Sequence, residues 1–243
     1  MYLAVLFLFA IPLESARALI VIDEFSDFQD VATSAPGTTS AELDGLDVLG
    51  GSRELTISAL ASNLAGGARI NIADTTPDAL LYDPTIGDSA IADGQIIWDG
   101  NQDNNMDPEG FNADGLGADG DGMDLNSGDL IRVVVNSSLP SDESSLAIEV
   151  ASDGGLNSAI SSRLLPIFGS NAITNYDFLF AEFPGVDFSD VSAIRLIIDT
   201  SADPGLQVEI ERVIVTTIPE PSTLVLLILG VVGMYSYSQP AAV

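Results

Sequence analysis

The segment LQVEIE at residues 206–211 alternates apolar and polar residues, the strongest local sign of the fold in this chain. A period of two places the apolar side chains on one face and the polar ones on the other, as in a half-buried β-strand. Similar short runs, enriched in Val, Ile and Phe, recur between Gly, Asn, Asp, Ser and Pro residues. The expected strands are 19–22, 54–59, 68–73, 95–98, 130–136, 145–151, 177–183, 192–199 and 206–216.

These runs predict an all-β fold, a two-layer antiparallel β-sandwich over residues 19–218. Many short strands separated by turn residues are typical of sandwiches, and almost no helical period interrupts them. No segment repeats at a fixed interval, so a propeller or a solenoid is disfavoured.

The composition removes several kinds of chemistry. The 243 residues contain no Cys, His or Lys, and 7 Arg face 36 Asp and Glu, for a formal net charge of −29. The chain therefore lacks disulfides, thiolate nucleophiles, a Ser-His-Asp triad and Schiff-base lysines. Its negative field repels nucleic acids, which we exclude as partners, and favours cations. Catalysis by paired carboxylates and binding of an oxygen-ligated ion remain open.

The first 18 residues have the pattern of a secretory signal peptide. An apolar run at 3–13 is followed by Ala16, Arg17 and Ala18, which offer small residues for cleavage after Ala18. The run is too short to span a bilayer. The alternative is a buried first strand or helix, in which residues 14–17, with the charges of Glu14 and Arg17, would be poorly accommodated.

The C-terminal region predicts one transmembrane helix. Residues 222–238 form a stretch of seventeen residues without charge, with Tyr235 placed as an interfacial aromatic. Pro221 suits the first turn of a helix. A buried soluble helix is the alternative, but it would need to be covered on all sides.

Just before this stretch, Pro219, Glu220 and Pro221 form a short motif. Together with the hydrophobic segment and the signal peptide, it resembles the PEP-CTERM sorting signal, here spanning 219–243. The resemblance implies an exosortase-type membrane enzyme as partner, which would cut near the motif in bacteria that make extracellular polysaccharide. The chain departs from the family at its end, SYSQPAAV, where such signals usually carry an Arg-rich cluster.

Three further stretches resemble a recurrent ectodomain type of PEP-CTERM proteins. They are IDEFS at 22–26, VLGGSREL at 48–55, and WDG at 98–100 followed at a distance by GDGMDL at 120–125. The resemblance implies a jelly-roll-like sandwich and an exported location. It implies no particular chemistry.

Residues 99–129 form an Asp/Gly-rich loop that is a candidate calcium site. Closely spaced carboxylates on a permissive backbone can surround Ca²⁺ with oxygen ligands. An EF-hand is excluded, because Asn104 and Gly110 stand where that loop needs Gly and Glu. The alternative is a solvated acidic connection without an ion. The candidate ligands are Asp99, Asp103, Asp119, Asp121 and Asp124.

Two single residues carry alternative interpretations. Arg53 is expected to form a structural ion pair with a buried carboxylate, although contact with a ligand stays open. Trp98 is expected in the core at a strand end, although stacking on a sugar ring stays open.

These observations favour a non-enzymatic, exported protein of structural or adhesive role in the extracellular matrix. It is expected to be anchored in the membrane or released to the cell surface after sorting. The alternative is a carbohydrate-binding module for extracellular polysaccharide, with calcium as its only candidate cofactor. An extracellular glycosidase or lyase is the weakest hypothesis, because among so many acids the spacing of a carboxylate pair has no specificity.

Overall fold

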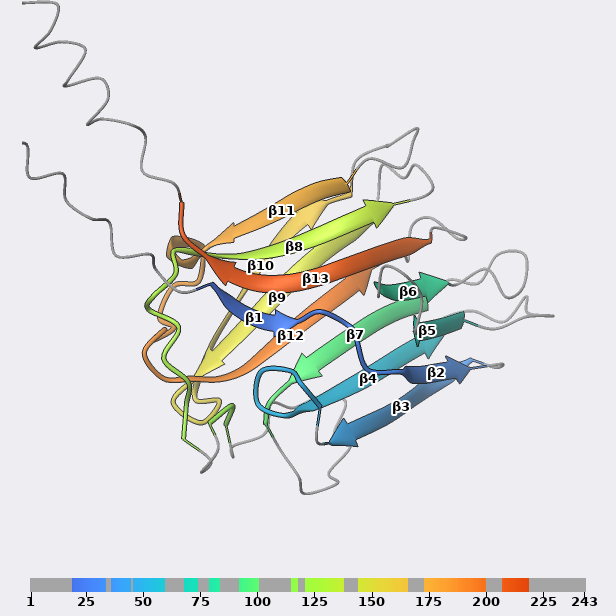
Figure 1. Cartoon of the computed structure of the whole chain (residues 1–243), viewed down its shortest axis with the longest axis horizontal. Helices are drawn as coiled ribbons and strands as arrows, with labels where there is room; N and C mark the ends of the chain where they lie inside the picture. Colours follow the sequence, from blue (N-terminus) through green and yellow to red (C-terminus); the bar gives the residue numbers. More distant parts are fainter. Residues whose placement is uncertain are drawn as a thin grey trace, which may run out of the picture.

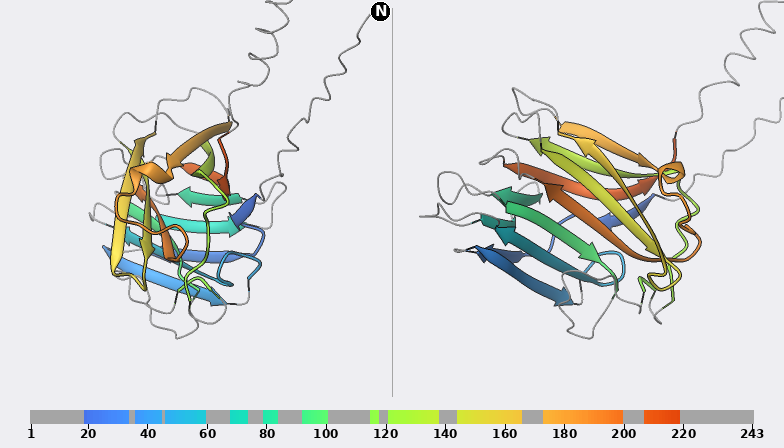
Figure 2. Two further views of the ribbon diagram at one scale, coloured as in Figure 1. Left: turned by 90° about the vertical axis from the view of Figure 1, so that its left-hand side faces the viewer. Right: turned by 180° about the vertical axis from the view of Figure 1, so that it is seen from behind.

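A computed structural model of the chain describes residues 19–33, 36–44, 46–59, 68–73, 79–83, 92–100, 115–117, 121–137, 144–165, 173–199 and 207–218. These residues form two antiparallel β-sheets packed face to face (Figure 1 and Figure 2). The predicted two-layer sandwich is therefore confirmed.

The seven-stranded sheet contains the first and the last strand of the described chain. Its strands are β1 (Ile20–Asp23), β2 (Gln29–Thr33), β5 (Ala68–Ala73), β6 (Ala79–Asp83), β8 (Leu130–Ser137), β11 (Ile173–Leu179) and β13 (Val208–Thr216). They lie in the order β11-β8-β13-β6-β5-β2, and β1 also pairs with β13.

The six-stranded sheet forms the other layer. Its strands are β3 (Gly37–Asp44), β4 (Ser52–Ala59), β7 (Ala92–Trp98), β9 (Ser145–Ser152), β10 (Asn157–Leu164) and β12 (Val191–Asp199). They lie in the order β10-β9-β12-β7-β4-β3, which leaves β10 and β3 at its edges.

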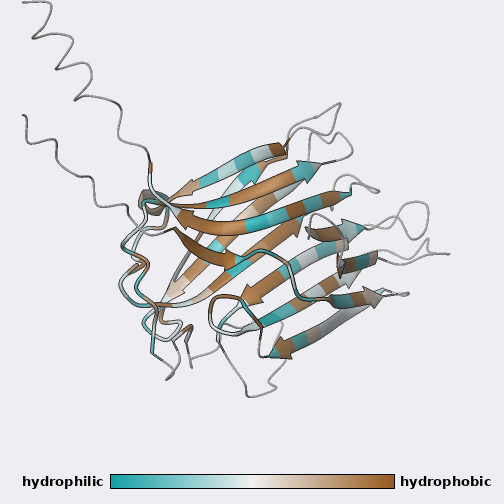
Figure 3. Ribbon diagram, viewed as in Figure 1, coloured by the Kyte–Doolittle hydropathy of each residue, from teal (hydrophilic) through white to brown (hydrophobic). Residues whose placement is uncertain are grey.

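The core lies between the two sheets, and apolar and polar residues alternate along many of the strands (Figure 3). Tyr82 of β6 extends toward β7, and its hydroxyl donates a hydrogen bond of 2.6 Å to the carbonyl of Ala92. Its ring occupies the space beside Gly94, where a Cβ would lie 2.9 Å from Tyr82 Cδ2. Gly94 is therefore required by packing between the layers.

The strands with clear alternation or apolar runs are where the sequence predicts them, with ends that differ by a few residues. Four strands are not predicted, namely β2, β3, β6 and β10. Both β3 (GTTSAELD) and β10 (NSAISSRL) contain several of the residue types that we assigned to turns, among them Gly, Asp and Ser in β3 and Asn and Ser in β10. Each is an edge strand and buries few of its side chains, so its sequence carries a weak apolar pattern.

The strand expected at 177–183 is wrong in its position. The strand is Ile173–Leu179, and Phe180–Glu182 form a short 3-10 helix. The rings of Phe180 and Phe188 stack with centroids 3.7 Å apart, so the chain turns to bury its aromatic residues instead of continuing the strand.

Both ends of the chain lie outside the described residues, including the predicted signal peptide at 1–18 and the segment 219–243 with Pro219, Glu220 and Pro221. Within the described part, no helix is long and apolar enough to cross a membrane. The predicted transmembrane helix stays a prediction.

Candidate functional site

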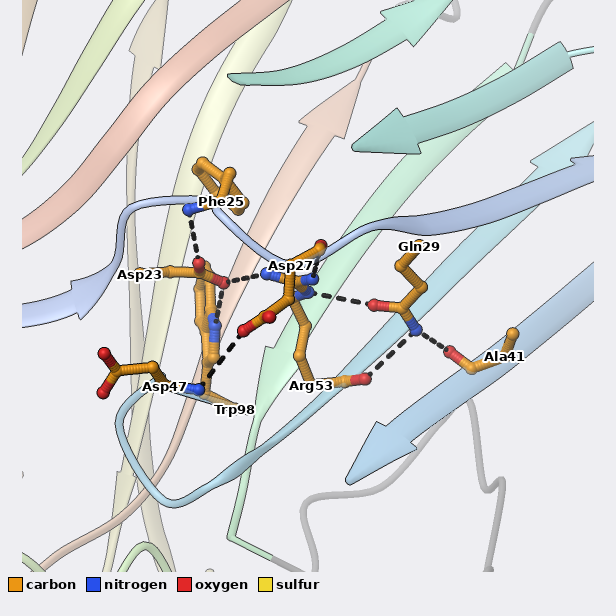
Figure 4. A network of polar contacts seen from close by, with 8 residues as sticks. All are labelled: Asp23, Phe25, Asp27, Gln29, Ala41, Asp47, Arg53 and Trp98. Carbon is orange, nitrogen blue, oxygen red and sulfur yellow. Dashed lines mark hydrogen bonds and ion pairs between the residues drawn. The ribbon is translucent and has the colours of Figure 1, made fainter. Parts of the chain in front are cut away.

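A buried polar network surrounds the guanidinium of Arg53, which has no exposed side-chain surface (Figure 4). Its Nη1 donates to Asp23 Oδ2 over 2.7 Å, and its Nε donates to Gln29 Oε1 over 2.9 Å. Its Nη2 donates to the carbonyl of Asp27 over 2.8 Å. Because every nitrogen of the guanidinium has an acceptor, the charge is compensated inside the sandwich.

Asp23 is the acidic centre of this network and is fully buried. Besides Arg53, its carboxylate accepts a bond of 2.9 Å from Trp98 Nε1 and one of 2.7 Å from the backbone N–H of Phe25. Burial raises the pKa of Asp23, and the charge of Arg53 together with these donors opposes that rise. The bond to Asp23 also holds Phe25 in the left-handed region, at a φ of 54°.

The network ties the two sheets together at one end of the sandwich. Asp23 and Gln29 belong to β1 and β2 of one sheet, and Arg53 and Trp98 belong to β4 and β7 of the other. Gln29 extends the link, because its Nε2 donates to the carbonyl of Ala41 in β3 over 2.8 Å. The arrangement is a structural clamp, sealed from solvent.

The three stretches that carry the ectodomain resemblance meet at this clamp. Asp23, Arg53 and Trp98 come from the first, second and third stretch respectively. The backbone N–H of Leu49 also donates to the carbonyl of Ile22 over 2.8 Å. Gly50, at a φ of 80°, approaches Gly100 so closely that a Cβ would lie 2.9 Å from the Gly100 Cα. The motifs therefore specify a folding contact.

The structure decides between the two interpretations of Arg53 and of Trp98. Arg53 forms the predicted ion pair with a buried carboxylate, and Trp98 is fully buried in the core. Trp98 is therefore not available to stack on a sugar ring in this conformation.

The Asp/Gly-rich segment 99–129 lies between the end of β7 at Trp98 and the start of β8 at Leu130. Its described parts pack on the sandwich: Leu116 and Leu125 are buried, and Met123 forms a β-bridge with Val191. These apolar anchors could not be recognised from the sequence, because each stands alone among polar residues.

The candidate calcium ligands are only partly placed. Asp103 and Asp119 lie outside the described residues, whereas Asp121 and Asp124 are exposed and Asp99 is half-buried. Asp124 Oδ1 accepts a bond of 2.9 Å from the backbone N–H of Asn126. Among the residues that the structure describes, no group of three or more acidic side chains is arranged to hold a metal ion. The calcium site stays a prediction.

The outer face of the six-stranded sheet bears aligned rows of polar side chains. Leu55, Ile96 and Leu196 point into the core, so the residues next to them on each strand point outward. The register places Ser40 of β3 opposite Thr56 of β4, and Thr56 opposite Gln95 of β7. The next row contains Glu42, Glu54, Ile97, Arg195 and Glu149.

Hydrogen bonds connect the side chains within this face. Arg195 Nε donates to Glu149 Oε2 over 2.9 Å, and its Nη1 donates to Gln95 Oε1 over 3.4 Å. Thr56 Oγ1 donates to Glu54 Oε1 over 2.9 Å, and it lies 2.8 Å from Ser40 Oγ. Because Thr56 has a single proton, Ser40 is the donor in that second bond.

The polar side chains of this face lie among apolar ones, because Ile97, Ile197 and Ala147 occupy the same rows. These rows run across all strands from β3 to β10, and the bulge in β12 lies only at the Val191 end. In the seven-stranded sheet, by contrast, β1 and β6 share one edge of β13, which divides that sheet. Gln95, Arg195 and Glu149 are half-buried, so they are fixed in place and still reach solvent. Sequence reasoning missed all three, because only the strand register brings them together.

A second clamp closes the side of the sandwich formed by β10 and β11. Arg163 Nη2 donates to Glu182 Oε2 over 2.6 Å and to the carbonyl of Asp177 over 2.8 Å. The Arg163 guanidinium also lies 4.9 Å from the centre of the Phe178 ring. Burial alone would raise the pKa of Glu182, but the bonds from Arg163 and Ser161 outweigh it and lower that pKa below its ordinary value.

No family model matches the chain, so the PEP-CTERM resemblance gains no support from that comparison, and no curated protein matches it either. Among solved structures it is similar to the family 11 carbohydrate-binding module of a Clostridium thermocellum cellulase, with 8% identity and a TM-score of 0.40 over 85% of this chain and 100% of the module. A family 30 carbohydrate-binding module from the same organism gives 9% identity and a TM-score of 0.41 over 82% of this chain and 98% of the module.

A family 29 carbohydrate-binding module from Piromyces equi gives 11% identity and a TM-score of 0.33, over 79% of this chain and 95% of the module. Identities and TM-scores this low do not determine what this chain binds.

Proposed function

We propose that the chain is a non-catalytic, exported β-sandwich that binds extracellular polysaccharide on the outer face of its six-stranded sheet. The observation that carries the proposal is the pair of half-buried side chains Ser40 and Gln95, on either side of the buried Thr56, beside the Arg195–Glu149 pair. Hydroxyl, amide, guanidinium and carboxylate groups together offer both donors and acceptors, as sugar hydroxyls require. Neighbouring strands lie about 4.8 Å apart, which spaces these groups along an extended chain of sugar rings.

The side chains of this face indicate which interactions would bind a polysaccharide and how strong each would be. Its described outward side chains include no aromatic residue, so recognition rests on hydrogen bonds, and each bond replaces one to water. The net gain for each neutral bond is about 1 kcal/mol. Useful attachment to a polysaccharide therefore depends on several such bonds along one chain or on several copies of the protein.

The two ends of the sequence complete this proposal. The signal peptide at 1–18 would export the chain, and the signal at 219–243 would anchor the sandwich outside the cytoplasm until an exosortase-type enzyme acts near Pro219, Glu220 and Pro221. The structural or adhesive role in the matrix, and the jelly-roll-like class, belong to the same proposal. A bound polysaccharide would give such a role its chemical basis.

The proposed calcium site lies in the Asp/Gly-rich loop. Its hard oxygen ligands would be Asp99, Asp103, Asp119, Asp121 and Asp124. Calorimetric titration of the full chain with calcium tests it, with magnesium as the control. Heat with calcium alone supports the site, and no heat at millimolar calcium removes it.

The carboxylates whose pKa departs from the ordinary value do not support a glycosidase or lyase activity. Asp23, whose pKa is raised, is fully buried against Arg53 and Trp98 and does not reach a substrate. Asp30, Glu182 and Asp187, whose pKa values are lowered, are engaged by Arg69, Arg163 and Ser189 respectively. A general acid needs a raised pKa together with access to the substrate.

An array of bacterial extracellular polysaccharides, probed with the full chain with and without calcium, tests the proposed function. We expect binding to at least one polysaccharide, and about tenfold weaker binding by Gln95→Ala, equivalent to about 1.4 kcal/mol. Asn175→Ala is the matched control, because Asn175 is exposed on the seven-stranded sheet. Absence of binding to every polysaccharide in both conditions would remove the proposal.

A further inference from the structure

The edge strand β10 has a long, regular and uncovered edge, as β3 does at the other end of the same sheet. It pairs with β9 through eight consecutive residues without a bulge, and no strand in the described part of the chain covers its other side. A long, regular and uncovered edge offers a row of backbone donors and acceptors to another strand.

The register shows which backbone groups of β10 face away from β9. The N–H of Leu165 donates to the carbonyl of Ser144 over 2.9 Å, which continues the pairing of Leu164 with Ser145. Hydrogen-bonded pairs alternate along an antiparallel ladder, so Arg163 and Ser161 bond to β9. Ile160, Ser162 and Leu164 therefore direct their N–H and carbonyl groups outward.

The side chains of the same residues lie on the outer face of the sheet and are exposed. Ile160 is 56% exposed and Leu164 is 67% exposed, with Ser162 between them. An antiparallel second copy of β10 centred on Ser162 would place each Ile160 opposite the Leu164 of the other copy. Such cross-strand apolar pairs stabilise a sheet.

Charge distinguishes β10 from β2, β3 and β11, the other strands at the ends of the two sheet orders. Glu42 and Asp44 lie on β3, Asp30 lies on β2 and Asp177 lies on β11, whereas β10 has no acidic residue. Its one charged side chain, Arg163, points inward to Glu182. In a chain with a formal net charge of −29, two copies repel each other. This electrostatic repulsion is weaker for contact through β10 than for contact through β2, β3 or β11, which carry acidic residues.

We propose that β10 is a self-association edge, through which two copies pair antiparallel about Ser162 and join their six-stranded sheets into one continuous sheet. The symmetry is a closed two-fold, in which the same strand serves both copies. The inference does not rest on polysaccharide binding. It would place two polysaccharide-binding faces side by side on the same surface.

Sedimentation of the purified full chain over a series of concentrations, in one mild detergent, tests this proposal. We expect a monomer–dimer equilibrium whose dissociation constant rises at least about tenfold in Ile160→Lys/Leu164→Lys. The control is Leu81→Lys, an exposed apolar residue of β6 on the other sheet, which should leave the equilibrium unchanged. An equal effect of Leu81→Lys would contradict a role specific to β10.

Two further variants separate pairing at this edge from a general loss of folding. Ile160→Asp/Leu164→Asp should also be monomeric, and an equal mixture of the Lys and Asp variants should form heterodimers, because opposite charges then face each other. Ser162→Pro should abolish the dimer while retaining the fold, since its N–H is not bonded to β9. A wild-type chain that is monomeric throughout, or a mixture that does not associate, would overturn the proposal.

Discussion

At the scale of single residues, the fold depends on charged groups placed where charge is costly. Arg53 and Asp23 are both fully buried, yet their remaining donors and acceptors are bonded to Gln29, Asp27, Trp98 and Phe25. A buried pair of this kind contributes little net stability relative to an apolar pair, but removing one partner leaves an uncompensated charge.

The first prediction concerns this clamp. Arg53→Met should lower the free energy of unfolding by about 3–5 kcal/mol, because Asp23 loses its partner in the interior. Arg69→Met is the control, since the Arg69–Asp30 pair is partly exposed and should cost at most about 1 kcal/mol. Urea unfolding of both variants measures the difference, and equal losses would show that Arg53 is not a special position.

Tyr176 supplies a second prediction at this scale. Its buried hydroxyl has no hydrogen-bond partner among the described residues, and burial raises its pKa to about 12 from an ordinary 10.0. Tyr176→Phe should therefore be neutral or stabilising by up to about 1 kcal/mol, because no bond is lost.

The raised pKa of Tyr176 also determines how the stability of the protein changes at alkaline pH. Since the folded pKa lies above the unfolded one, the unfolded chain loses its proton first, and wild-type stability falls between pH 10 and about 12. In Tyr176→Phe this part of the loss should be absent. Unfolding measured at pH values below and within that interval tests it, and parallel losses in both proteins would contradict it.

The roles of Arg53 and Trp98 could be predicted from the sequence because Arg and Trp are rare residue types in this chain. The chain has 1 Trp and 7 Arg, and the few Arg residues of an acidic sandwich readily find carboxylates. Gln29 and Gln95 could not be assigned, since nothing in their local sequence indicates which strand lies opposite.

At the scale of elements, alternation identified the strands that are buried on one face and missed those that are mainly polar. The edge strands β3 and β10 owe their conformation to pairing with β4 and β9, not to apolar side chains of their own. Such pairing is tertiary, and local propensity does not report it.

The clamp between β10, β11 and the 3-10 helix gives the third prediction. The pKa of Glu182 is below its ordinary 4.5, so its contribution to stability is complete above pH 4.5 and is lost as pH falls through the lower folded value. Glu182→Gln should be less stable than wild type at neutral pH, and the difference should shrink below pH 4.5. A difference that is constant with pH would contradict the ion pair.

At the scale of the whole molecule, sequence could establish two layers but not their strand order. The first strand, β1, pairs with the last, β13, and β2 and β3 lie in different sheets although they are consecutive. These choices depend on contacts between distant segments, so the polar rows on the six-stranded sheet could not be foreseen.

The net charge gives the fourth prediction. With a formal charge of −29, self-repulsion destabilises the compact state, so sodium chloride should raise the unfolding midpoint as its concentration approaches about 0.15 M. Screening also weakens the exposed ion pairs, but each contributes at most about 1 kcal/mol. A midpoint that falls with salt would show that the pairs outweigh the repulsion.

Side-chain nuclear magnetic resonance of the full chain, titrated with the polysaccharide that it binds, tests the proposed function most directly. The resonances of the Gln95 amide and the Arg195 Nε should shift, while that of the Asn175 amide on the other sheet should not. Shifts confined to the seven-stranded sheet, or no polysaccharide that moves Gln95, would contradict the assignment of the binding face.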